Sequence, residues 1–328
     1  MLDSRCKHGD RYQTGTNQTI TIICQYHQHE SIPMSSSESS FSFLQTNESK
    51  IWWLLRLGVC LEFIGHGAFG VITKAGWLPY FAVWGIPESW AWHIMPIVGT
   101  MDIILGLLAF FAPRKALLLF MAAWGLMTAL LRPLAGEPVS ELLERAYNYC
   151  VPLAAFLMIY WDMKSHGWWH RVKNIPNLSQ KHWGGLKIFL QVAIAVYLIG
   201  HGAFGAFDAK TGLIIHYDAT GISTLFGSTE AALTIIGWFE IILGISVLLA
   251  PIAPLLFFVY FWKIVTESLF IFSGAFYGGF EFIERGASMV VPLALYFIVL
   301  ILKNPQFAAR QAPSTTFDKI AANDRDRY

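Results

Sequence analysis

The chain has 328 residues, of which only 14% are Asp, Glu, Lys or Arg, whereas soluble domains carry about 25%. Hydrophobic residues make up 55% and aromatic residues 15%, and this balance excludes a disordered chain and a disulfide-rich secreted domain. The net charge of +1 gives no field to attract nucleic acid, so we expect no nucleic-acid partner. The P-loop, Rossmann, Gly-x-Ser-x-Gly and His-Glu-x-x-His motifs of soluble enzymes do not occur in it. The composition predicts an integral membrane protein whose main partner is the lipid bilayer.

Residues 1–50 form a polar tail that differs from the rest of the chain. The tail contains a serine cluster at 35–40 and no apolar periodicity, so we expect it to be disordered. It lacks the charged start, apolar core and cleavage site of a secretory signal. We also hypothesise that translation starts at Met34, which peptides from residues 1–33 of the native protein would refute.

From residue 51 onward, apolar runs of about 18–22 residues recur, the length that a helix needs to cross a bilayer core. Backbone groups in hydrocarbon must bond to one another, and the runs are continuously apolar rather than alternating, so helices are favoured over a barrel. The predicted fold is all-α, a polytopic membrane protein with eight transmembrane helices. We place them at 51–72, 91–112, 115–135, 143–161, 186–207, 230–250, 254–273 and 285–302.

Between the first two runs lies the segment 77–90, which begins and ends with tryptophan. Pro79 and Pro87 interrupt it, and it is too short to span a bilayer. We expect it to lie along the outer surface as an amphipathic segment.

Basic residues in the connections between runs predict the orientation in the membrane. One side collects Arg114, Lys115, Lys164, Arg171, Lys173, Lys181, Lys303 and Arg310. Lys and Arg concentrate in the cytoplasmic connections of membrane proteins. We therefore expect both termini in the cytoplasm and the protein in the plasma (inner) membrane.

The two halves of the apolar region repeat each other. Ile64–Gly70 (IGHGAFG) returns unchanged as Ile199–Gly205, and Asp102–Gly106 (DIILG) returns as Glu240–Gly244 (EIILG). Further ordered matches are Trp124 with Trp262, Glu144-Arg145 with Glu284-Arg285, and Val151-Pro152-Leu153 with Val291-Pro292-Leu293. They predict two four-helix modules, module 1 at 51–163 and module 2 at 186–302. A cytoplasmic linker at 164–185 would join the modules and a cytoplasmic tail at 303–328 would follow; with an even helix number per module, the repeats are parallel.

Ionisable side chains inside the predicted spans mark a polar intramembrane site in each module. A charge at mid-bilayer costs about 2.5–3.5 kcal/mol, so such groups need partners. The candidate residues are Glu62, His66, Asp102, Arg132, Glu144 and Arg145 in module 1, and His201, Glu240, Lys263, Glu267, Glu284 and Arg285 in module 2. Lys263 is expected to pair with Glu267, one turn away, and Asp102 with Arg132 or a histidine. The Glu-Arg pairs fit either structural ion pairs or a functional site.

His66 and His201 each stand in the sequence Gly-His-Gly-Ala-Phe-Gly. The glycines allow another helix or a flat ligand to approach the backbone closely. A histidine in an apolar helix is usually a packing residue, but recurrence in both modules favours a function. One hypothesis is that His66 and His201 face each other and ligate haem or a metal, for which imidazole is suitable. No Cys-x-x-Cys-His or His-x-x-x-His pattern supports it.

Two motifs of module 1 are similar to those of a known family. The first helix is glycine-rich, with Phe69-Gly70 and a following Lys74, and the second reads acidic residue, two apolar residues, then Leu-Gly-Leu-Leu from Asp102 to Leu108. In these features the chain resembles DoxX-like membrane proteins over residues 51–161 and, more faintly, 186–302. Its tandem form and its two histidines depart from the usual single module. The resemblance implies a four-helix fold per module and a quinone-linked role beside other membrane subunits.

Three classes of function are consistent with these features. The first is an accessory or redox subunit that holds a quinone or a protein partner at the polar cluster. The second is a transporter or channel for a small solute or protons. The third is a lipid-binding or scaffold protein in which the charges only join helices. Whether the chain is an enzyme stays open among them.

Overall fold

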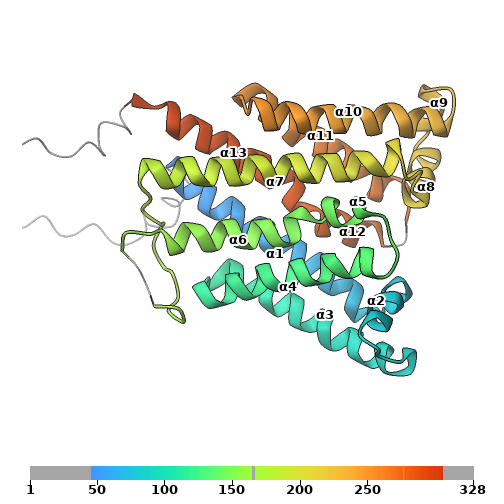
Figure 1. The fold of residues 1–328 in the computed structure, drawn as a ribbon, viewed down its shortest axis with the longest axis horizontal. Helices are drawn as coiled ribbons and strands as arrows, with labels where there is room; N and C mark the ends of the chain where they lie inside the picture. The colour runs from blue at the N-terminus through green and yellow to red at the C-terminus, as the bar shows by residue number, and fades with distance from the viewer. Residues whose placement is uncertain (1–45, 165–166, 276, 306–328) are drawn as a thin grey trace, which may run out of the picture. The chain divides into compact units, whose positions relative to one another are not determined.

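The computed structural model describes residues 46–164, 167–275 and 277–305, and every regular element in these ranges is helical (Figure 1). In this part of the chain, seven helical stretches are long and apolar enough to cross a membrane. They are α1 (Asn47–Val71), α3 (Glu88–Phe111), α4 (Lys115–Leu134), α7 (Gln180–Ala206), α10 (Thr229–Leu249), α11 (Ala253–Phe272) and the stretch Gly278–Lys303, which comprises α12 (Gly278–Glu284) and α13 (Gly286–Lys303). The prediction of an all-helical integral membrane protein is confirmed.

The segment expected to form the fourth crossing consists of two helices, as does Gly278–Lys303. Over 139–160 the structure has two helices, α5 (Val139–Glu144) and α6 (Ala146–Tyr160), which meet at Arg145. The helix breaks there because Arg145 has ψ of 18° and its guanidinium turns back to the Glu141 carbonyl, 3.3 Å away. With 15 residues, α6 covers roughly 22 Å. Within the described ranges, seven stretches rather than the predicted eight are long and apolar enough to cross a membrane.

Short helices lie between the long ones. η3 (Ala75–Trp77) and α2 (Leu78–Val83) follow α1, and α8 (Thr211–Ala219) and α9 (Ile222–Leu225) follow α7. The segment 77–90, expected along the surface, is exposed only in part. Trp77 and Tyr80 are buried, whereas Trp84 and Trp90 are exposed.

The other predicted boundaries differ from the helix ends by a few residues. α1 begins at Asn47, where Thr46 Oγ1 accepts a hydrogen bond from the Ser49 N–H at 3.2 Å, so residues 47–50 of the expected tail are helical. α7 begins at Gln180, within the expected linker. Residues 1–45, with Met34, and 306–328 lie outside the described residues.

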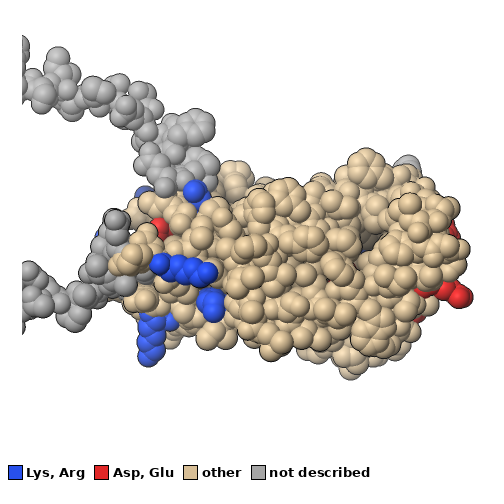
Figure 2. All heavy atoms as spheres, turned by 90° about the horizontal axis from the view of Figure 1, so that it is seen from above, with Lys and Arg blue, Asp and Glu red and all other residues tan. Residues whose placement is uncertain are grey.

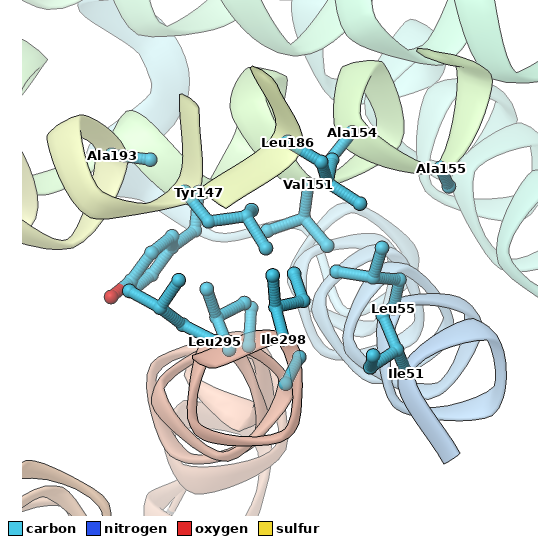
Figure 3. Packing of buried hydrophobic residues seen from close by; sticks show 14 of the residues in the cluster. Ile51, Leu55, Tyr147, Val151, Ala154, Ala155, Leu186, Ala193, Leu295 and Ile298 are labelled. Carbon is cyan, nitrogen blue, oxygen red and sulfur yellow. The ribbon is translucent and has the colours of Figure 1, made fainter. Parts of the chain in front are cut away.

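Helices α1, α6, α7 and α13 surround the main apolar core. Figure 3 shows Ile51 and Leu55 of α1, Val151 of α6, Leu186 of α7 and Ile298 of α13 meeting there. Each central helix carries one outer helix: α3 packs on α1, α4 on α6, α10 on α7 and α11 on α13. The outer helices expose large apolar side chains, among them Ile104, Leu107, Ile242, Phe261 and Val265. Apolar surface on the outside of a helical bundle is what contact with lipid requires.

Charged side chains separate along the helix axes. In Figure 2, Lys and Arg gather at one end, where some acidic surface is also visible, and the other end shows Asp and Glu; a broad band between the ends carries neither on the visible face. The exposed basic residues Lys164, Arg171, Lys173, Lys181 and Lys303 define the basic end. The exposed acidic residues Glu88, Asp218 and Glu230 define the acidic end. An uncharged band between two charged ends matches the profile of a bilayer.

Candidate functional site

Glycines around each histidine bring it close to an acidic residue on the next helix. A Cβ at Gly67 would lie 2.5 Å from the Gly99 carbonyl oxygen of α3, and one at Gly202 would lie 2.5 Å from the Gly237 oxygen of α10. The backbones of the paired helices therefore touch. The glycines were predicted to allow close approach of either another helix or a flat ligand. In the structure they contact another helix.

His66 forms the first histidine–carboxylate pair. Its Nδ1 lies 3.0 Å from Asp102 Oδ2, and Asp102 Oδ1 accepts a hydrogen bond from Trp124 Nε1 at 2.9 Å. The His66 ring stacks on Trp77 with the ring centroids 4.6 Å apart. Asp102 is buried, and its contact with Nδ1 fixes the position of the imidazole ring. The other ring nitrogen, Nε2, is then the one that can contact a ligand.

His201 forms the second pair, with Glu240, and this pair has an additional cation. Glu240 accepts hydrogen bonds from His201 Nδ1 and, at 2.9 Å, from Trp262 Nε1. Lys263 Nζ lies 3.3 Å from Glu240 and 2.7 Å from Glu267, which confirms the predicted Lys263–Glu267 pair. Both carboxylates of this site thus have a buried ammonium group as partner.

The arginines of the two Glu-Arg motifs have matching local contacts. Arg145 Nη1 lies 2.7 Å from the carboxylates of both Glu141 and Glu144. Arg285 Nη1 lies 2.6 Å from Glu281, the residue one turn before it. Each arginine therefore ends a short helix and neutralises that helix's own acidic residue.

Arg285 also joins the two halves of the bundle, α1–α6 and α7–α13. Its Nη2 lies 3.8 Å from Glu144 Oε1 in the first half, while its Nε faces Glu267 at 3.4 Å. Glu284 is 3.6 Å from the same guanidinium. The cluster is consequently a shared feature of both halves rather than a separate site in each.

Two lysines also form ion pairs between the halves, each with a glutamate of the other half. Lys74, which follows α1, lies 3.0 Å from Glu281 of α12, and Lys210, which precedes α8, lies 2.7 Å from Glu141 of α5. Burial lowers the pKa of Lys210, against the opposing effect of the Glu144 and Glu141 carboxylates. Burial also lowers the pKa of His216 on α8.

Arg132 has different partners from those considered in the sequence. It does not bind Asp102, whose carboxylate is held by His66 and Trp124; its Nη1 lies 3.3 Å from Glu137 and 3.9 Å from Glu141. Its guanidinium lies 4.5 Å from the centre of the Tyr80 ring. Arg132 therefore belongs to the acidic end of the bundle and not to the histidine pair.

An apolar cavity of about 320 Å³ lies in the first half. Its wall consists mainly of aromatic and aliphatic side chains of η3, α2, α3 and α4: Trp77, Tyr80, Phe81, Trp84, Ile94, Val98, Trp124 and Leu131. Its polar lining includes His66, Thr128, Arg132, Arg145 and Asn148. We refer to this space as the apolar cavity.

A second space, of about 340 Å³, lies between the halves toward the acidic end. Side chains of both halves line it, including Lys74, Arg132, Glu141, Arg145, His201, Lys210, His216, Glu281, Glu284 and Arg285. We refer to it as the charged cavity.

Glu62 lies between two much smaller spaces. One, of about 10 Å³, is bordered by Glu62 together with His66, Asp102 and Asn148. The other, of about 20 Å³, is bordered by Glu62 together with Glu144, Arg145, Tyr147, Asn148, Tyr197, Glu284 and Arg285. His66, Asp102 and Glu144 therefore do not share one cavity, and Glu62 and Asn148 connect their surroundings.

Several residues beyond the candidates complete the site. Trp77 stacks on His66, Asn148 contacts Glu62, and Trp124 and Trp262 donate to the two acidic residues. The match between Trp124 and Trp262 was the available signal for the tryptophans. Asn148 follows Glu144 and Arg145 among the polar residues at the start of the predicted fourth span, whereas the contact of Trp77 with His66 depends on the tertiary structure.

The two histidines do not line the same cavity. His66 borders the apolar cavity and His201 the charged one, and each has its Nδ1 occupied by its own carboxylate. Among the described residues, no group of three or more His, Cys, Asp or Glu side chains is placed to hold a metal ion.

No protein-family model, curated protein or solved structure matches this chain.

Proposed function

We propose that this chain is a DoxX-like membrane protein of two parallel four-helix modules with eight crossings. The contacts of the halves support this by their correspondence: a Cβ at Gly65 would lie 2.2 Å from the Glu284 nitrogen, and one at Gly200 would lie 2.3 Å from the Glu144 nitrogen. In this proposal α6 supplies the eighth crossing, preceded by α5 as α13 is preceded by α12.

The proposed orientation places the basic end and both termini in the cytoplasm, with the plasma (inner) membrane as the location. The exposed Lys and Arg residues of the basic end support it, because positive charge is retained on the cytoplasmic side. The two cavities then lie in the outer half of the membrane, around the histidines and the acidic end.

The apolar cavity carries the proposed function, which is binding of a quinone-type ligand. Its volume of about 320 Å³ is within the range of small-molecule pockets. Such a ligand needs a flat apolar slot and a hydrogen-bond donor for its carbonyl oxygen. Aromatic side chains supply the slot. With Nδ1–H donating to Asp102, the His66 Nε2 atom accepts the hydrogen of a quinol hydroxyl when the ring is neutral and donates to a quinone carbonyl when the ring is protonated.

In this site, the residues of the chain bind and orient the ligand and handle a proton. Trp77, Tyr80 and Phe81 provide stacking surface, and His66 donates a hydrogen bond or a proton to the ligand oxygen. Asp102 lies within hydrogen-bond distance of His66 Nδ1 and so fixes the orientation of the ring. A bound quinone would supply two-electron carrier chemistry, so we assign the protein as an accessory subunit beside redox partners in the membrane.

Ligand binding to His66 variants tests the proposal. A decyl-substituted benzoquinone should quench the tryptophan fluorescence of the purified protein in nanodiscs, because three tryptophans line the apolar cavity. His66→Ala should weaken binding of the quinone about tenfold, because one hydrogen bond between His66 and the ligand oxygen is lost. His93→Ala is the matched control, since His93 is exposed on α3 and does not line the cavity. Equal binding by the two variants would contradict the proposal.

A transporter for a small polar solute is the second candidate, favoured by the charged cavity between the halves. It predicts that proteoliposomes accumulate the solute and that Lys210→Ala reduces the flux, while quinone binding is unchanged. A protein with neither activity that loses only stability in such variants would be a lipid-binding or scaffold protein.

A further inference from the structure

We propose that Glu62 relays protons between the charged cavity and the His66–Asp102 pair. The inference rests on the proposed ligand site at His66 and deepens it by naming the source of its proton. Intramembrane carboxylates and histidines in series are the usual elements of a proton path.

Glu62 has one carboxylate oxygen that nothing in the described chain satisfies. The residue is 4% exposed, and no hydrogen-bond donor among the described residues reaches its Oε2. With its amide nitrogen facing Glu62, Asn148 donates to Oε1 at 2.7 Å. A buried oxygen without a partner is costly unless it is protonated or meets a water. A protonated carboxyl group and a carboxylate that binds a water are the two states through which a proton relay passes.

The two small spaces beside Glu62 fit single water molecules. A water needs roughly 10–15 Å³ of this kind of volume and two to four polar partners. The spaces of about 10 and about 20 Å³ meet the first condition. Glu62 and Asn148 border both of them, so each space also offers polar partners.

At both ends, the small spaces share residues with the large cavities. Arg145, Glu284 and Arg285 border the larger of the two small spaces and also the charged cavity. His66 and Asn148 border the smaller one and also the apolar cavity. A series of polar groups therefore leads from the charged cavity through Glu62 to the ligand site.

The second half has no counterpart of this relay at the matched position. Tyr197 replaces Glu62 there, and its hydroxyl donates to Glu267 Oε1 at 2.9 Å. Lys263 already occupies that carboxylate and Glu240. Because Glu62 is an acid and the matched Tyr197 is a hydroxyl in an ion-paired site, we place the proton path in the first half only.

The transfer conserves protons. A water in the larger of the two small spaces gives one proton to the Glu62 carboxylate and recovers it from the charged cavity. Protonated Glu62 passes its proton through the second water to the Asp102–His66 pair, and His66 delivers it to the ligand oxygen. Groups that face Glu62 and affect its protonation are His66, Asp102, Glu144, Arg145, Tyr147, Asn148, Tyr197, Glu284 and Arg285.

The stack of His66 on Trp77 provides a reporter that needs no ligand, because an imidazolium quenches indole fluorescence on contact. A stopped-flow drop in pH should quench a component of the fluorescence that Trp77→Phe removes. Glu62→Gln, which keeps the side-chain shape, should slow this component at least tenfold. Glu88→Gln, on the exposed start of α3, is the control and should leave the rate unchanged.

An unchanged rate in Glu62→Gln would overturn the relay, since protons would then reach His66 through the apolar cavity. Infrared spectra provide a second measurement: a carboxylic acid band that shifts in D₂O should be present in the wild type and in Glu88→Gln and absent from Glu62→Gln. Its persistence in Glu62→Gln would also refute the proposal. Failure of the ligand site appears separately, as missing quinone binding with the proton kinetics intact.

Discussion

Gly125 and Lys263 hold matched positions in the sequence and make the two halves different. A Cβ at Gly125 would lie 2.1 Å from the Asn148 carbonyl oxygen, so α4 and α6 touch there. Lys263 is fully buried in the corresponding place, with its ammonium group between Glu240 and Glu267. A single side chain thus neutralises one histidine–carboxylate site, while the other stays beside an apolar cavity.

Replacing Lys263 by methionine should therefore reduce stability strongly. Loss of one partner from a buried ion pair leaves an uncompensated charge, which costs about 3–5 kcal/mol. Thermal unfolding in detergent should show this loss, and the double variant Lys263→Met, Glu267→Gln should recover part of it. Lys181→Met is the control, since Lys181 is exposed at the basic end. A single variant as stable as the control would show that the buried pair contributes nothing.

The elements of the bundle are held together by contacts that only glycine permits. On α7, the position of Gly200 lies directly against the Glu144 backbone at the end of α5. Gly184, on the same helix, has no atom within 4 Å of its Cβ position. The same substitution at these two positions therefore separates helix packing from helix propensity.

Gly200→Ala should destabilise the protein, since its methyl group would lie 2.3 Å from the Glu144 nitrogen and push α5 from α7. We expect a loss of about 1–3 kcal/mol, as for overpacked cores. Gly184→Ala should instead stabilise by up to about 1 kcal/mol, because alanine is the better helix former. Thermal unfolding of both variants gives the comparison, and a similar shift for the two would argue against the close contact.

At the scale of the whole molecule, the difference in charge between the two ends predicts which end faces the cytoplasm. Lys173 at the basic end and Asp218 at the acidic end are both exposed and lie outside the long helices. They are suitable positions for labels on opposite sides of a membrane.

A membrane-impermeant maleimide should label Asp218→Cys in right-side-out vesicles and Lys173→Cys only after the vesicles are opened. Cys6 and Cys24 are replaced by serine in both variants to remove background from the tail. The reverse pattern would place the termini outside and contradict the orientation.

How far the sequence predicts this fold depends on whether a feature is local. Helix positions and the Lys263–Glu267 pair follow from apolar length and from spacing on one helix, and both were predicted. The break at Arg145 was missed, because it arises from contacts of its side chain with the preceding turn. The partners of Arg132 and the contact of Trp77 with His66 depend on how distant helices are arranged. Hydropathy carries no information on that arrangement.

Lys74 and Lys210 each find their carboxylate in the opposite half of the chain. Either half alone would therefore leave one of these lysines without its carboxylate. Because both halves belong to one covalent chain, the partners need not be identical, as they would be in a symmetric homodimer. Tyr197 and Lys263 can accordingly stand where the first half has Glu62 and Gly125.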